Sequence, residues 1–173
     1  MKLIKRVKEE EVWGHWEKVE KWRDKGVRWD IRGGLPPRTD MNWYEARIEE
    51  KDIEKIYIIS SEDWRVITKS FKVSEAVQSL KKGIDDAKID DILKKKEKYM
   101  SDINSIDRKL ILICTSEEGN YTIIEGNKRA VALLSINRLV NTEIYLGISK
   151  KIQNYGWAHY ANKGAACTEN IES

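Results

Sequence analysis

One short stretch of this chain, EGNKR at residues 125–129, carries side chains that could hold an anion. It stands where an apolar strand over 121–125 gives way to an apolar helix over 127–136. The first turn of a helix has backbone N–H groups without intrahelical partners, and the helix dipole makes that end positive. Gly126 lets an anion approach the backbone closely, and Arg129 offers a planar fork that fits two phosphate oxygens. The pattern therefore favours a phosphate site.

The other three residues of the stretch extend this interpretation. Asn127 can cap the helix or bond a ligand oxygen, and Lys128 adds positive charge. Cations in a first helical turn are disfavoured by about 0.3–1 kcal/mol, so the presence of two indicates that an anionic ligand binds there. Glu125 could hold a magnesium ion or take a proton from a hydroxyl. The alternative is an ordinary strand-to-helix turn with charged surface residues.

A second acidic pair follows the first convincing strand of the chain, which is predicted over 55–60. Glu62 and Asp63 come directly after it, and strand ends often line such sites. Phosphoryl transfer needs an acid near the acceptor hydroxyl, so Glu62, Asp63 and Glu125 are the candidates for that role. A solvated loop is the alternative interpretation of the first two.

The composition bounds the protein class. The chain has 173 residues, 35% charged and 40% hydrophobic, with a net charge of +3, as in a soluble globular protein with no favoured nucleic-acid partner. The lysine run over 94–98 most simply solvates a helix face, and a patch that contacts phosphates is the alternative. No apolar run approaches the roughly 20 residues that span a bilayer. Cys114 and Cys167 form no disulfide or metal pattern, so we expect a reducing cytoplasm and a buried, inert Cys114.

The predicted elements alternate between helix and strand. We expect helices over 3–23, 42–50, 75–82 (capped by Ser74), 86–100 and 127–136, and strands over 55–60, 109–116, 121–125 and 142–149. A tight turn at 117–120 joins the second and third strands, and the second is expected to be central. This order predicts a compact α+β fold, a small mixed sheet with packed helices.

Three segments are predicted. Residues 1–54 form a Trp-rich helical and loop extension that packs on the core, residues 55–149 form the core, and residues 150–173 form a partly disordered tail. Trp13, Trp16 and Trp22 most simply pack a helix onto the core; an aromatic platform for a ligand is the sharper alternative.

The stretch GNYTIIEGNKRAVALLSI resembles the signature of the ParB/sulfiredoxin-like superfamily, in which an acidic or small residue, Gly, two variable residues and Arg follow a strand and open a helix. The resemblance covers roughly residues 55–149. It implies a nucleotide-binding core with the phosphate chain held by Gly126, Asn127, Lys128 and Arg129. The nearest functional branch is that of the free-amino-acid kinases, whose version keeps an acid, the Gly and the Arg but adds two histidines absent here.

This chain differs from two branches of the superfamily, and the differences limit which activities the resemblance implies. Sulfiredoxins carry a catalytic cysteine within the motif, where this chain has Asn127, so sulfiredoxin chemistry is not expected. Chromosome-partition ParB proteins continue into a helix-turn-helix domain, for which the residues after the last predicted strand leave no room.

The leading functional hypothesis is a small phosphotransferase or nucleotide hydrolase. It would use a nucleoside di- or triphosphate with Mg²⁺ held through Glu125, and it would act on a small hydroxyl-bearing substrate. The alternatives are a ParB-like nucleic-acid-associated protein or nuclease, and a nucleotide-sensing module without catalysis.

Overall fold

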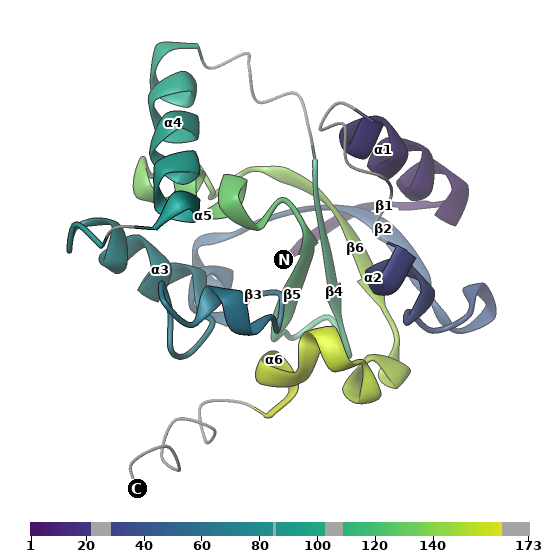
Figure 1. The fold of residues 1–173 in the computed structure, drawn as a ribbon. Coiled ribbons are helices and arrows are strands. Elements are labelled where there is room, and N and C mark those ends of the chain that lie inside the picture. The colour runs from purple at the N-terminus through teal and green to yellow at the C-terminus, as the bar shows by residue number, and fades with distance from the viewer. Residues whose placement is uncertain (22–28, 85, 103–108, 164–173) are drawn as a thin grey trace, which may run out of the picture.

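The computed structural model describes residues 1–21, 29–84, 86–102 and 109–163. Its strands form one mixed sheet in the order β1-β2-β6-β4-β5-β3 (Figure 1). The strands are β1 (Lys2–Val7), β2 (Asn42–Arg47), β3 (Ile56–Ile58), β4 (Leu110–Cys114), β5 (Tyr121–Glu125) and β6 (Glu143–Ile148). β3 is parallel to β5 and β4 is parallel to β6, while the other neighbours are antiparallel. The expected α+β fold with a small mixed sheet is confirmed.

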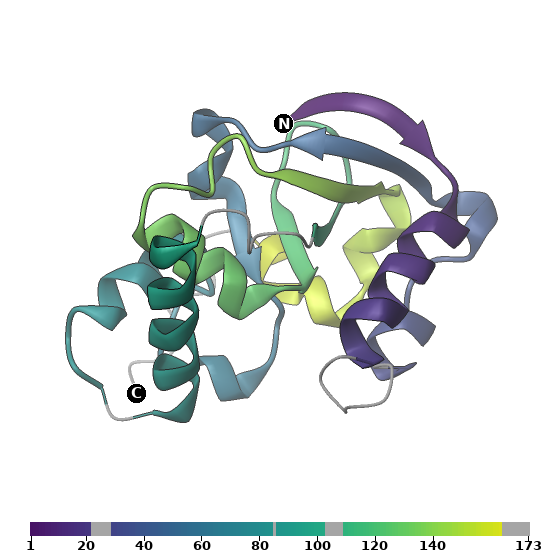
Figure 2. The ribbon, with the colours of Figure 1, turned by 90° about the horizontal axis from the view of Figure 1, so that it is seen from above.

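Helices gather in two groups around the sheet. They are α1 (Glu9–Lys21), α2 (Trp29–Gly33), α3 (Val73–Leu80), α4 (Ala87–Ser101), α5 (Asn127–Ser135) and α6 (His159–Lys163), with short 3₁₀ turns η1 (Arg38–Asp40), η2 (Glu50–Lys55), η3 (Glu62–Trp64), η5 (Lys150–Asn154) and η6 (Gly156–Ala158). In Figure 1 and in Figure 2, α3, α4 and α5 lie on one side of β4 and β5, whereas α1 and α2 lie on the other. No helix in the described part of the chain is long and apolar enough to cross a membrane.

β4 and β5 are the buried centre of the fold. Every residue of both strands is buried, as expected for strands with neighbours on both edges. The prediction that the second strand is central is confirmed, because β4 lies between β6 and β5. Cys114 is buried as predicted, and burial raises the pKa of its thiol to about 12. Its chemical inertness stays a prediction; Cys167 lies outside the described residues.

The prediction of a helix over 3–23 is wrong for its first part. Residues Lys2–Val7 form β1, which pairs antiparallel with β2, and the helix begins only at Glu9. The spacing of Leu3, Ile4 and Val7 fits a helical stripe, but β-branched residues also suit strands, and pairing with a distant strand decides between the two.

The predicted short helix over 42–50 is also wrong. Residues Asn42–Arg47 form β2, which hydrogen-bonds to β1 on one edge and β6 on the other. Aromatic residues such as Trp43 and Tyr44 fit a half-buried pleated surface. The first 54 residues therefore contribute two strands to the same sheet as well as a helical layer.

Two tryptophans of α1 pack as predicted. Trp16 is buried in the core, and Trp13 lies 5.3 Å, between ring centroids, from Trp43 of β2 in an edge-on arrangement. Trp22 lies outside the described residues. Residues 150–163 of the predicted tail are folded into η5, η6 and α6, and residues 164–173 lie outside the described part.

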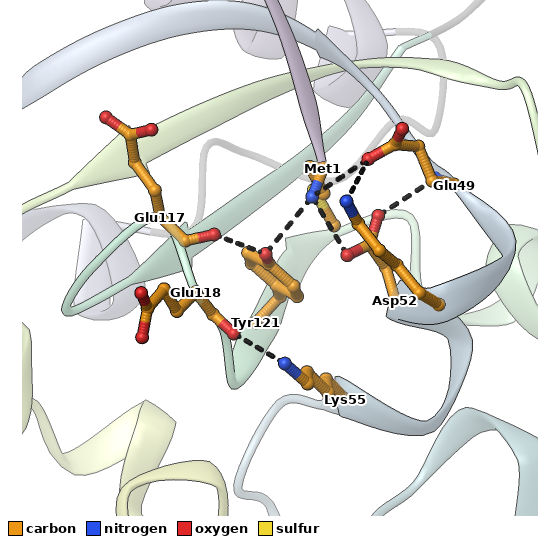
Figure 3. Close-up of polar contacts among 8 residues, drawn as sticks. Met1, Glu49, Asp52, Lys55, Glu117, Glu118 and Tyr121 are labelled. Carbon is orange, nitrogen blue, oxygen red and sulfur yellow. Dashed lines mark hydrogen bonds and ion pairs between the residues drawn. The ribbon is translucent and has the colours of Figure 1, made fainter.

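A polar cluster joins the start of β1 to η2 and to β5, a strand of the opposite half of the sheet (Figure 3). The α-amino group of Met1 lies 2.9 Å from Asp52 Oδ1 and 3.3 Å from the hydroxyl oxygen of Tyr121. Asp52 also accepts a hydrogen bond from the backbone N–H of Glu49 at 2.9 Å, and the Tyr121 hydroxyl donates to the Glu117 carbonyl at 2.7 Å. These bonds join β1, η2 and β5, which are remote in sequence.

The loop before α3 covers the outer edge of β3. The Phe71 carbonyl accepts a hydrogen bond from Ile58 N–H at 2.7 Å. Phe71 itself has φ 61°, a conformation that non-glycine residues rarely adopt. Its ring is fully buried and stacks on Tyr160 at 3.8 Å between centroids. This packing stabilises a backbone that would otherwise cost about 1–3 kcal/mol.

Glu75 of α3 holds that loop in place. Its carboxylate accepts hydrogen bonds from Thr68 Oγ1 at 2.6 Å, from the backbone N–H of Ser70 at 2.7 Å and from that of Lys69 at 3.1 Å. Ser74, predicted to cap this helix, lies in its first turn instead, and the residue at the N-cap position is Lys72.

Replacing Glu75 with Gln is expected to lower the free energy of unfolding at pH 7 by about 1.5–3 kcal/mol, because a charged acceptor is lost. Burial tends to raise the pKa of Glu75, but the hydrogen bonds from Ser70, Thr68 and Lys69 lower it below 4.5. A lowered pKa gives stability that is present above the unfolded value and lost as the pH falls through the folded value. Urea unfolding should therefore show the difference between wild type and variant shrinking below about pH 4.5. Glu97→Gln, at an exposed position of α4, is the control, and equal stability of wild type and Glu75→Gln at pH 7 would refute the anchoring role.

Candidate functional site

The turn between β5 and α5 is built around a left-handed glycine. Gly126 has φ 97° and ψ 23° and occupies the N-cap position of α5. A Cβ added there would lie 2.4 Å from Leu110 Cδ2 and 2.9 Å from Arg129 Nη2. Glycine is therefore required by the turn itself, since both the conformation and the space exclude a side chain. The sequence alone predicts another reason for this glycine, namely that it lets an anion approach the backbone closely.

A cavity of about 490 Å³ opens at this turn. It is lined by all five residues of the EGNKR stretch together with Asp63, and further by Ile31, Ile59, Trp64, Lys88, Asp91, Lys95 and Ile124. The structure thus brings the four predicted phosphate-binding residues and two of the three predicted acids to one cavity. The third acid, Glu62, is not among the lining residues.

Glu125 and Arg129 form a buried ion pair at the base of the cavity. Their exposed fractions are 4% and 6%, and Arg129 Nη2 lies 3.3 Å from Glu125 Oε1. The two residues are four apart across the start of α5. Removing either member of a buried pair leaves an uncompensated charge, at a cost of about 3–5 kcal/mol, so the pair fixes the orientation of both side chains.

Asn127 links the start of α5 to the end of β3. Its Oδ1 accepts a hydrogen bond from the backbone N–H of Ile59 at 3.0 Å. The predicted capping role is wrong, because Gly126 holds the N-cap position and Asn127 is the first residue of the helix. The Nδ2 amino group is the part of this side chain that could donate to an anion.

Lys128 is held by an acid from α4. Its Nζ donates to Asp91 Oδ2, and this hydrogen bond lowers the pKa of the Asp91 carboxyl. The Lys128 side chain therefore lies across the contact between α4 and α5.

Glu62 and Asp63 are adjacent in sequence but face different surroundings. Asp63 Oδ2 lies 3.2 Å from Lys88 Nζ, inside the cavity lining. Glu62 pairs instead with Arg65 and accepts a hydrogen bond from the Tyr160 hydroxyl at 2.8 Å. The bond from Arg65 lowers the pKa of Glu62. Of this pair only Asp63 is placed to serve the cavity.

The histidines lie away from the cavity lining. His15 Nε2 lies 2.9 Å from the Lys109 carbonyl oxygen. Because a carbonyl only accepts, Nε2 carries a proton. Burial lowers the pKa of His15, and its ring packs edge-on against Tyr145 at 5.3 Å between centroids. His159 packs edge-on against Tyr160. Both rings therefore pack against tyrosines.

One wall of the cavity is the face of α4 that carries Lys88, Asp91 and Lys95, of which the sequence singled out only the run that contains Lys95. Their spacing of three and four residues places them on one side of a helix. The sequence contains that spacing, but only the packing of α4 against α5 shows that this side faces the EGNKR turn. Of the lysine run over 94–98, Lys95 alone lines the cavity.

Replacing Gly126 with Ala tests how tightly the turn is constrained. A matched control is Gly83→Ala, because Gly83 also has a positive φ of 64° but an added Cβ there meets nothing within 4 Å. At either site, the left-handed backbone alone should lower the free energy of unfolding by about 1–2 kcal/mol when Ala replaces Gly. At Gly126, the clash with Leu110 should lower it by about 1–3 kcal/mol more. Denaturant unfolding measures both, and equal losses would show that the turn relaxes around a side chain.

A scan against protein-family models, a search of curated proteins and a search of solved structures each found no match for this chain.

Proposed function

We propose that the cavity binds a nucleoside di- or triphosphate through its phosphates, and that the protein is a small phosphotransferase or nucleotide hydrolase. The observation that carries the proposal is the meeting of an α5 amino terminus, Lys128 and Arg129 with the carboxylate of Asp63 in one cavity. Such a site supplies the positioning and charge stabilisation that phosphoryl transfer chiefly needs. The resemblance of the EGNKR stretch to the ParB/sulfiredoxin-like signature points to the same ligand class.

The size and lining of the cavity suit such a ligand. Its volume of about 490 Å³ falls within the range of about 300–1,000 Å³ for small-molecule sites. Charged groups come from η3, α4, β5 and α5, while Ile31, Ile59 and Ile124 give apolar surface. A nucleotide carries both kinds of surface, since its phosphates are charged and its base is flat and largely apolar on its faces.

Asp63 is the acid that the geometry favours as proton acceptor. Glu125 is buried and its Oε1 faces the Arg129 guanidinium, so its charge orients that group. Asp63 is 56% exposed in its side chain and lies at the rim, where an acceptor can enter. In the transfer, the bond from the terminal phosphorus to its bridging oxygen breaks, and that oxygen keeps the electron pair. A new bond forms from phosphorus to the oxygen of water or of a small substrate hydroxyl, whose proton passes to Asp63.

The carboxylates of the cavity could hold Mg²⁺ only together with the phosphates of a bound nucleotide. Among the residues that the structure describes, no group of three or more His, Cys, Asp or Glu could hold a metal. Mg²⁺ in nucleotide sites commonly takes one or two carboxylates together with phosphate oxygens and water. The sequence predicts Glu125 as the carboxylate that holds it, but Glu125 is buried and paired with Arg129. The phosphates and water would therefore supply most ligands of the ion, which would neutralise phosphate charge.

A second candidate is a nucleotide-sensing module without catalysis. The ion pair between Lys88 and Asp63 favours it, because a carboxylate held by a lysine is already engaged and less ready to accept a proton. The two candidates share the phosphate site and differ in the role of Asp63.

Nucleotide binding is tested on two residues of α5. Arg129→Lys keeps a positive charge beside Glu125 but loses the planar fork, and Lys128→Ala removes one cation. The first should weaken ATP binding by about 1.5–3 kcal/mol, the range for hydrogen bonds to charged groups, and the second by less. Lys98→Ala, on an exposed part of α4 outside the cavity, should bind like wild type.

Isothermal calorimetry with ATP, ADP, CTP and GTP measures the effect, and thermal melts check that each variant is folded. The phosphate site is excluded if wild type binds none of the four at millimolar concentration, or if Arg129→Lys and Lys128→Ala both bind as tightly as wild type.

The role of Asp63 is tested by turnover. Asp63→Asn should retain nucleotide binding and lose about 10²–10⁴-fold in phosphate release or transfer, the usual contribution of a general base. Glu125→Gln serves as the comparison. Loss of turnover in Glu125→Gln with full activity in Asp63→Asn would move the base to Glu125, and absence of turnover in wild type that binds nucleotide would favour the sensing module.

A further inference from the structure

The α4 face of the cavity carries two lysines that the phosphate site at α5 does not use. Lys88 and Lys95 are seven residues apart, which is close to two helical turns, so both point to the same side of α4. Both line the cavity that also contains the α5 turn. α4 and α5 pack directly on one another. Cations therefore border the cavity from two different helices.

The lysines of both helices are paired with acids. Lys88 pairs with Asp63 at 3.2 Å, and Lys128 of α5 pairs with Asp91 of α4. The Asp91 side chain is 51% exposed and can turn into water when another anion takes Lys128, because exposed ion pairs are individually weak. Lys88 can contact an anion while it stays paired with Asp63, because an ammonium group has three N–H donors.

We propose that Lys88 and Lys95 form a second anion subsite, so that the cavity selects ligands with two or more linked phosphate groups over monophosphates. This rests on the proposed phosphate site at Gly126–Arg129, which would hold one phosphate. The next phosphate along the chain lies against the α4 lysines. Lys128 stands between the two helices and contacts both groups.

The arrangement also gives the bound ligand a direction. Ile31 belongs to α2, which lies on the opposite side of β4 and β5 from α4 in both views of the fold (Figure 1 and Figure 2). The lining is therefore cationic toward α4 and apolar toward α2. The phosphate chain points to α4, and the rest of the ligand points to Ile31.

The experiment compares pyrophosphate with orthophosphate, and ADP with AMP, by calorimetry without magnesium. Wild type should bind the diphosphate member of each pair at least tenfold more tightly. Lys88→Ala combined with Lys95→Ala should remove most of that preference while leaving the affinity for orthophosphate and AMP within about twofold of wild type. The matched control is Lys96→Ala combined with Lys98→Ala, which removes the same charge from positions of α4 outside the lining and should keep the preference.

A second variant is expected to bind pyrophosphate more tightly than wild type, which loss of structure would not produce. Asp91→Asn removes the acid that competes for Lys128 and should tighten pyrophosphate binding severalfold. Asp90→Asn, on the neighbouring exposed position that does not line the cavity, should leave it unchanged.

The outcomes separate this inference from the proposed function. If wild type binds neither phosphates nor nucleotides, both fail. If Arg129→Lys weakens every ligand but the double variant of Lys88 and Lys95 keeps the full preference for diphosphates, the second subsite is refuted and the phosphate site at α5 stands. An Asp91→Asn variant that binds pyrophosphate no more tightly than wild type would likewise exclude exchange between carboxylate and phosphate.

Discussion

The buried ion pair of Glu125 and Arg129 is the constraint around which the site is arranged. Two charges taken out of water are tolerated only in good geometry, with partners on each. The pair spans the exact point where β5 becomes α5, so strand and helix must meet at a fixed angle. That angle demands the left-handed Gly126, whose missing side chain leaves room for Leu110 and the guanidinium. Backbone, packing and charge thus require the same residues at this joint.

The neighbouring elements hold the joint from outside. Asn127 accepts a hydrogen bond from Ile59, which fastens α5 to the end of β3. In the described part of the chain β3 has β5 as its one strand neighbour, and its other edge is covered by the loop containing Phe71. Glu75 ties that loop to α3 through several hydrogen bonds. α3, the loop and β3 therefore hold the first turn of α5 in place from one side. The charged residues line the other side of that turn, which faces the cavity.

The sequence predicted the elements whose signals are local and strong. β4, β5, α5 and β6 follow from apolar runs bounded by turn residues, and α4 begins at its Asp86 cap, within one residue of the prediction. β1 and β2 were missed, because their residues suit helix and strand alike and the partner that decides between them lies about 40 residues away or more. In the site, the EGNKR turn was predicted from its own residues. The α4 lysines and the divergence of Glu62 from Asp63 depend on how distant elements pack, which spacing alone does not encode.

The charges of the cavity bear directly on the proposed anion binding. Among the described residues, four cations and three carboxylates line it, so this lining exceeds neutrality by a single positive charge when each group is ionised. A ligand with two or more phosphates brings more negative charge than that excess, and it must either displace carboxylates or arrive with a cation. Asp91 is exposed enough to move into water, whereas Glu125 is buried against Arg129 and stays. In the proposed site the exposed acids would therefore decide which anions bind the lysines, and the buried Glu125 orients Arg129.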